Sequence, residues 1–83
     1  MIQFMFTVRD DKAEAYFQPF FVPNENLAIR AMKDCIGDEN HQFSKHTEDF
    51  SLYALGTYDD SQGKFELLDK PTHLANLIDL KGE

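Results

Sequence analysis

Apolar side chains occupy every second position from Ile2 to Val8, with mostly polar residues between them. A period of two predicts a strand with one buried face. Residues 15–22 are rich in aromatic and β-branched side chains and predict a second strand. Pro19 cannot donate a hydrogen bond to a neighbouring strand, so the second strand is predicted to lie at an edge or to contain a bulge.

The apolar period changes to three and four after Asn24, a residue that favours the N-cap position. This change predicts a helix over residues 25–36 that ends at Gly37. Residues 50–58 and 64–68 predict two more strands, joined by a hairpin loop with Gly63 in the left-handed conformation. Pro71 predicts the start of a short final helix. The polar residues 38–49 form a long connection, which indicates a functional segment.

The order of these elements predicts one α+β domain over residues 1–83. Its sheet is antiparallel and consists of two hairpins, with one main helix between them and a short C-terminal helix. A chain of 83 residues has a thin core, and association into a homodimer is a common remedy. Residues 16–22 also place apolar groups on both faces of one strand, which favours a dimer or another partner.

The net charge of −7 is concentrated in residues 37–83, where four lysines stand against ten acidic residues. An acidic field opposes binding to phosphate backbones, so non-specific DNA binding by a monomer is disfavoured, while a local site within residues 1–36 stays open. A lone Cys35 makes no internal disulfide and is typical of a reducing cytoplasm. The longest apolar runs fall well short of the roughly 18 residues that span a bilayer, so we expect no membrane association.

Catalytic and metal-binding patterns are weak in this sequence. Zinc sites usually contain close pairs of ligands, whereas this chain has no cysteine pair and no histidines at helical spacing. Cys35 falls on the apolar face of the predicted helix, where cysteine behaves as a small hydrophobic residue. There is no glycine-rich phosphate loop. We therefore predict no metal, no cofactor and no enzymatic activity.

Single-stranded nucleic acids bind to aromatic rings with cations nearby. Both are present in the sequence, the rings as Tyr16, Phe20, Tyr53 and Tyr58 and the cations as Arg9, Lys12, Arg30 and Lys33. The competing interpretation is that the rings form the core and cross-strand pairs, and that Arg30 and Lys33 belong to a solvated helix face.

Three segments resemble a known family, in order and spacing. They are Lys12-Ala13-Glu14-Ala15-Tyr16-Phe17-Gln18-Pro19-Phe20-Phe21 with Ala28-x-Arg30 after it, His41-Gln42-Phe43-x-Lys45-His46-x-Glu48-Asp49-Phe50-x-Leu52, and Leu55-Gly56-x-Tyr58-Asp59-Asp60-x-x-Gly63. Over residues 4–70 the chain resembles the small nonstructural protein of gokushoviruses, single-stranded DNA phages of the microvirus family. Thr47 stands where that family often has proline.

The resemblance implies an accessory protein that acts in the host cytoplasm on the switch from duplex replication to single-stranded genome synthesis. It supplies no catalytic residues. The first hypothesis is binding to a viral or host replication protein, as a homodimer. One alternative is direct binding of single-stranded DNA. Another is that this acidic chain mimics DNA with its carboxylates and thereby inhibits a host protein. Candidate partner- or DNA-binding residues are Tyr16, Phe20, Arg30, Lys33, His41 and His46.

Overall fold

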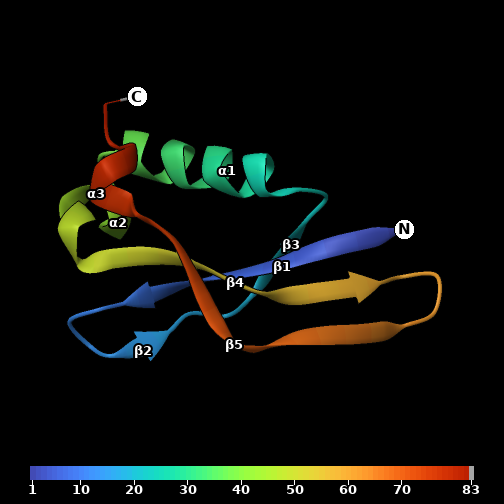
Figure 1. Cartoon of the computed structure of the whole chain (residues 1–83). Helices are drawn as coiled ribbons and strands as arrows, with labels where there is room; N and C mark the ends of the chain where they lie inside the picture. Colours follow the sequence, from blue (N-terminus) through green and yellow to red (C-terminus); the bar gives the residue numbers. More distant parts are fainter. Residues whose placement is uncertain (83) are drawn as a thin grey trace.

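The computed structural model describes residues 1–82 and shows one curled antiparallel sheet with the main helix across one side (Figure 1). The predicted α+β class is confirmed. In chain order the elements are β1 (Ile2–Asp10), β2 (Ala15–Tyr16), β3 (Phe20–Val22), α1 (Glu25–Gly37), α2 (Gln42–Lys45), the 3-10 helix η1 (Thr47–Asp49), β4 (Phe50–Asp59), β5 (Lys64–Asn76) and α3 (Leu77–Leu80).

The sheet has β1 and β4 at its centre. The short strands β2 and β3 both pair with β1 on one side, and β5 pairs with β4 on the other, all antiparallel. The predicted second strand is therefore an edge strand in two pieces, with Pro19 in the gap between them. Proline has no N–H to donate to the ladder, which agrees with this gap, and beside it the Phe17 N–H still donates to the Val8 carbonyl at 2.8 Å.

The core lies between the sheet and α1. Phe6 and Val8 of β1 point toward the helix, where they pack with Ala28, Met32 and Ile36. These three residues recur every four positions along α1, with Ala31 and Cys35 partly buried beside them, so the predicted apolar stripe faces the core. Within the same cluster, Leu52 of β4 is fully buried.

Helix α1 begins and ends where its sequence indicates. The Asn24 side chain accepts a hydrogen bond from the Leu27 N–H at 3.0 Å, which satisfies one of the free donors of the first turn. The helix ends at Gly37, but this glycine is not in the left-handed conformation. Asp38 is extended instead, and its N–H donates to the Cys35 carbonyl at 3.2 Å.

The connection over residues 38–49 contains two short helices rather than a polar loop alone. Phe43 of α2 is buried, and its ring centroid lies 4.7 Å from that of Phe50 and 5.4 Å from that of Phe17. One aromatic side chain thus anchors an otherwise polar segment to the core.

The predicted short C-terminal helix is confirmed as α3, but its predicted start near Pro71 is wrong. Strand β5 continues through Pro71 to Asn76, and α3 starts only at Leu77. Proline is tolerated here because Pro71 lies in a stretch of this edge strand that has no regular partner in β4, so no hydrogen bond of the ladder is lost.

The pairing of β4 with β5 is irregular near the middle of β5. Ala54 lies opposite Thr72, whereas Gly56 lies opposite Leu67, so residues 68–71 of β5 face Leu55 alone. Strand β5 bends at this point (Figure 1). None of the helices within residues 1–82 is long and apolar enough to cross a membrane.

Candidate partner-binding surface

The side of the sheet that faces away from α1 carries a row of rings. Residues opposite each other in an antiparallel pair point to the same side, so the partners of Met5, Thr7 and Arg9 lie away from the core. We call the rings on this side the aromatic face: Tyr16, Phe21, Tyr53, Tyr58, Phe65 and His73.

One end of the aromatic face is a cluster of three rings from three strands. The ring centroid of Tyr58 lies 4.7 Å from that of Phe65 and 5.9 Å from that of Phe21. Beneath this cluster Met5 is buried, yet Phe21 stays 43% exposed and Phe65 55%. Leu67, on the same side of β5, is 70% exposed. Such a contiguous apolar surface is typical of a binding site.

The other end combines rings with a cation. Tyr53 makes edge-to-face contacts with Tyr16 at 5.5 Å and with His73 at 5.4 Å. The Arg9 guanidinium lies 5.8 Å from the centroid of the Tyr16 ring, a cation–π arrangement. Tyr16 itself is half exposed. This end therefore presents open aromatic edges together with one positive charge.

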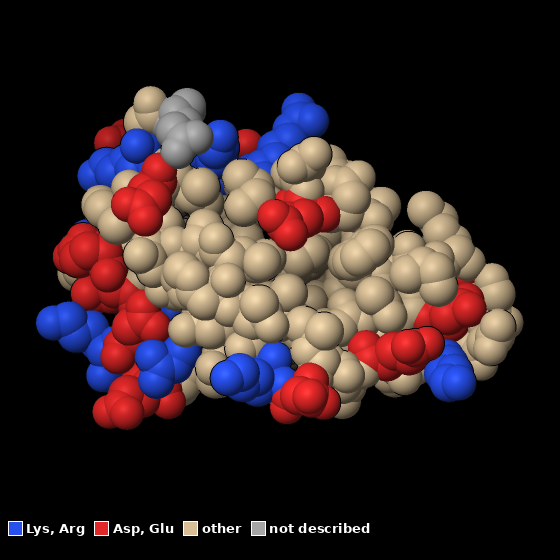
Figure 2. Space-filling model, in the orientation of Figure 1, with Lys and Arg blue, Asp and Glu red and all other residues tan. Residues whose placement is uncertain are grey.

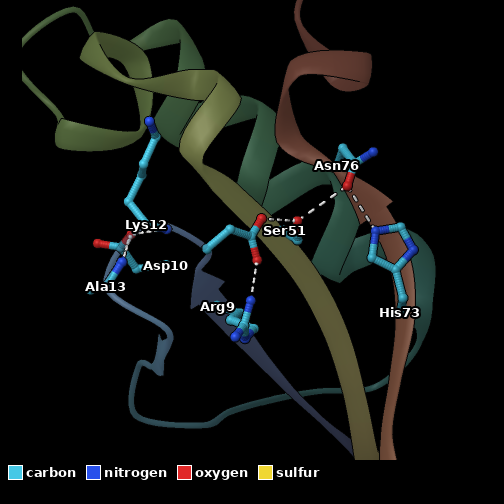
Figure 3. Close-up of polar contacts among 8 residues, drawn as sticks. Arg9, Asp10, Lys12, Ala13, Ser51, His73 and Asn76 are labelled. Atoms are coloured by element: carbon cyan, nitrogen blue, oxygen red, sulfur yellow. Dashed lines mark hydrogen bonds and ion pairs between the residues drawn. The ribbon is translucent and has the colours of Figure 1, made fainter.

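A chain of polar contacts joins Arg9 to His73 across the sheet (Figure 3). Arg9 pairs with Asp11 at 2.9 Å, and the buried Ser51 hydroxyl donates to the other Asp11 oxygen at 2.6 Å. Ser51 Oγ also lies 3.1 Å from Oδ1 of Asn76, which is 2.8 Å from Nε2 of His73. The side chains thus connect β1, β4 and β5.

The same network balances the positive charge of Arg9. The hydrogen bond to Asp11, more than any other influence, raises the pKa of Arg9, which is charged throughout the physiological range in any case. With Asp11 2.9 Å away, the charge of Arg9 is largely neutralised locally. Phosphate binding would have to compete with Asp11 for the guanidinium.

The predicted site residues of the first half lie on different sides of the sheet. Tyr16 belongs to the aromatic face, but Phe20 packs toward the core, 6.0 Å from the Phe6 ring. Uninterrupted alternation would put residues 16 and 20 on one side; the break at residues 17–19 separates them. Arg30 is exposed and Lys33 half-buried on α1, across the sheet from Tyr16.

The two predicted histidines lie at the ends of α2. Nδ1 of His41 accepts a hydrogen bond from the Phe43 N–H at 3.0 Å, so His41 caps this helix. His46 is exposed and, with Glu48 and Asp49, offers three ligand atoms within 4.8 Å of one another. Three such donors at the surface are fewer than the four of a structural zinc site, and exposed acidic groups are commonly just hydrated.

Sequence reasoning missed Phe21, Phe65 and His73 as members of the face. The pairing of Tyr58 with Phe65 could have been found, since the turn at Gly63 fixes the register of the β4–β5 hairpin. His73 could not, because the strand beyond Pro71 was predicted to be helical.

The fold and this surface define a small α+β protein with one sheet, helices on one side of it and open aromatic rings on the other. A comparison with protein families places it more narrowly: residues 3–80 match the family Phage ORF5 protein, and the chain belongs to this family. It is therefore a bacteriophage protein, and the family supports an accessory role. Neither the comparison with curated proteins nor that with solved structures finds a match.

Proposed function

We propose that this phage accessory protein modulates viral DNA replication in the host cytoplasm by binding a replication protein through its aromatic face. The observation that carries the proposal is the cluster of Phe21, Tyr58 and Phe65, in which Phe21 and Phe65 are exposed on the side of the sheet that the helices leave uncovered. Aromatic residues are enriched at the centres of protein interfaces because they bury much area at a low entropic cost.

The proposed step is the switch from duplex replication to single-stranded genome synthesis. It comes from the resemblance to the gokushovirus nonstructural protein, and membership of a phage family agrees with it. Binding without catalysis is part of the proposal. Its chemistry is the desolvation of rings: burying roughly 100 Å² of apolar surface contributes about 2.5 kcal/mol before entropic costs.

Electrostatics favour a protein over DNA as the partner. The chain carries a net charge of −7, and the cation on the aromatic face, Arg9, is already paired with Asp11. Nucleic-acid affinity depends on free Lys and Arg that displace counterions from phosphates. An interface centred on Phe21 and Phe65 needs no such charges.

A second candidate function is the binding of single-stranded DNA at the Tyr16 end of the same face. It is favoured by the position of Arg9 against the Tyr16 ring, with Tyr53 beside them. Bases stack on such rings with roughly 1–3 kcal/mol per base. The two candidates differ in salt dependence, since only DNA binding weakens steeply with salt.

The test is a pull-down from infected cells with the tagged protein, with and without nuclease, followed by identification of the retained proteins. The Phe21→Ser variant removes a ring from the exposed cluster. Its matched control is Ile78→Ser on α3, where an equally exposed apolar side chain lies off the sheet. We expect a replication protein to be retained by the wild type and by Ile78→Ser after nuclease treatment, and lost with Phe21→Ser.

Labelled single strands distinguish the second candidate. Micromolar affinity that falls steeply between 50 and 200 mM salt, together with loss of every retained protein after nuclease, would replace the protein partner by DNA. Equal retention by Phe21→Ser and wild type would remove the aromatic face from the proposal.

A further inference from the structure

The outer edge of β5 is an open strand edge. Strand β5 is the last strand of the sheet, and its residues from Lys64 to His73 are all exposed. The opposite edge consists of the short pieces β2 and β3 with Pro19 between them, which is a poor template for pairing. Within residues 1–82, β5 is therefore the long edge at which another strand can add.

This edge is apolar as well as unpaired. Phe65 and Leu67 lie on the aromatic face, and Leu68, on the helix side, is 46% exposed. Natural proteins usually protect such edges with charges, proline or bulges, and β5 has Pro71 and an irregular stretch at residues 68–71 toward its far end and charged side chains among the apolar ones. Between Lys64 and Lys70 the outer side of β5 has no partner strand within residues 1–82, and this part carries both apolar and charged side chains.

A hollow of about 260 Å³ opens beside this edge on the helix side of the sheet. Phe4, Phe6 and Ala54 line it, and Leu68 closes it toward the edge. The even-numbered residues of β5 point to this side, because Glu66 pairs with Thr57 and Thr72 pairs with Ala54. A side chain added next to Leu68 would therefore extend the apolar wall of the hollow.

The charges along β5 show which strand fits. The order is Lys64, Glu66, Asp69 and Lys70, positive at both ends and negative between. Along the margin where β5 lies, Figure 2 shows basic and acidic groups side by side, next to a broad uncharged area toward α1. Within this order Glu66 and Lys70 carry opposite charges and each lies two residues from Leu68, so reversal of the strand about Leu68 places each of them opposite the other.

We propose that β5 pairs antiparallel with β5 of a second copy of this chain, about a two-fold axis at Leu68. In a regular antiparallel pair, the residue numbers of every two opposing residues add up to the same sum. With Leu68 opposite Leu68 of the second copy, Glu66 lies opposite Lys70 of the second copy, and Lys70 opposite Glu66. Two opposite-charge pairs then flank a leucine pair on the helix side of the sheet. A two-fold axis makes the contact self-complementary and closed.

This pairing forms a continuous sheet across the dimer and leaves both aromatic faces on one side. It is independent of the proposed replication partner, because it uses the edge of β5 rather than the rings. The Phe21→Ser variant is expected to remain a dimer, whereas the variants of β5 below address only self-association.

Charge reversal tests whether a second copy of the chain pairs with β5 and whether it does so in the proposed register. Sedimentation equilibrium from 1 to 200 μM would compare the wild type with Glu66→Lys, Lys70→Glu and the double variant. Each single reversal creates two like-charge contacts by symmetry, so we expect its dimer dissociation constant to rise about tenfold. The double variant restores both pairs, and with the wild-type net charge, it should return to within about threefold of the wild type.

Hydrogen exchange adds a measurement of the backbone. Amides within residues 66–70 should exchange more slowly at 200 μM than at 5 μM, because pairing at the edge satisfies them. A wild type that stays monomeric at 200 μM overturns the proposal. The proposal is also overturned if the single reversals leave the dimer dissociation constant unchanged, or if the double variant does not restore it. Another surface or register would then hold the dimer.

Discussion

Gly56 of β4 lies against the carbonyl oxygen of Glu66 in β5, so closely that a Cβ atom at position 56 would overlap this oxygen and approach Leu67 Cα to 2.9 Å. The φ angle of Gly56 is 152°, a conformation that side chains rarely adopt. This contact lies where the β4–β5 register changes between Ala54 and Gly56. Glycine is thus required for the two strands to pair beyond the irregularity.

Gly56→Ala is expected to destabilise the fold by about 3 kcal/mol or more, because it combines backbone strain with a clash against main-chain atoms that cannot move aside. Urea unfolding followed by circular dichroism measures this as a lower midpoint. The control is Gly37→Ala, at a position with nothing within 4 Å and no positive φ, where we expect a gain of up to about 1 kcal/mol. Equal midpoints for the two variants would contradict the role of Gly56.

Asn24→Ala should lower the free energy of unfolding by about 1 kcal/mol. The variant loses the hydrogen bond from the Leu27 N–H, which then has no partner in the helix. Asn26 is the matched control, since it is exposed in the first turn. Asn26→Ala is expected to change stability by less than about 0.5 kcal/mol. A loss of equal size for both variants would show that asparagine content, and not the cap, is responsible.

Local signals in the sequence predicted most of the fold. Pro19, Asn24 and Gly63 each act through their own backbone chemistry, and the structure has an edge-strand break, an N-cap and a left-handed turn at these positions. Pro71 misled the prediction, because proline at a helix start and proline on an open strand edge have the same local appearance. The difference between them depends on which strand ends the sheet, and that is a tertiary property.

The candidate surface was less predictable. Its rings come together through pairing between distant strands, and a single displaced residue moves a ring to the other side of the sheet. Phe20 shows this, since the break at residues 17–19 places it with Phe6 instead of Tyr16. The prediction that residues 16–22 place apolar groups on both faces of one strand agrees with the exposure of Tyr16 and Phe21 and the packing of Phe20 against the core.

The Cys35 thiol should react slowly with a disulfide reagent such as DTNB. Burial on α1 raises its pKa, and the neighbouring charges of Asp34 and Asp38 raise it further. A raised thiol pKa means less thiolate at a given pH, and the thiolate is the reactive form. We expect the rate in the native protein to have its pH midpoint above that of an unstructured thiol, because the pKa of Cys35 is raised. In 8 M urea the midpoint should fall to that of an unstructured peptide; a native midpoint below it would contradict the prediction.

Replacement of Phe43 by alanine should mainly lower stability, whereas replacement of Phe21 by alanine should mainly remove partner binding. Phe43 is 5% exposed between Phe17 and Phe50, so Phe43→Ala leaves a cavity and is expected to lose about 3–5 kcal/mol, enough to unfold much of the protein at 25 °C. Phe21 is 43% exposed, and Phe21→Ala should lose no more than about 1 kcal/mol while it removes partner binding. Urea unfolding and the pull-down, performed on the same preparations, measure the two effects. A folded Phe21→Ala protein that still retains the partner would show that this ring belongs to the stability of the sheet alone.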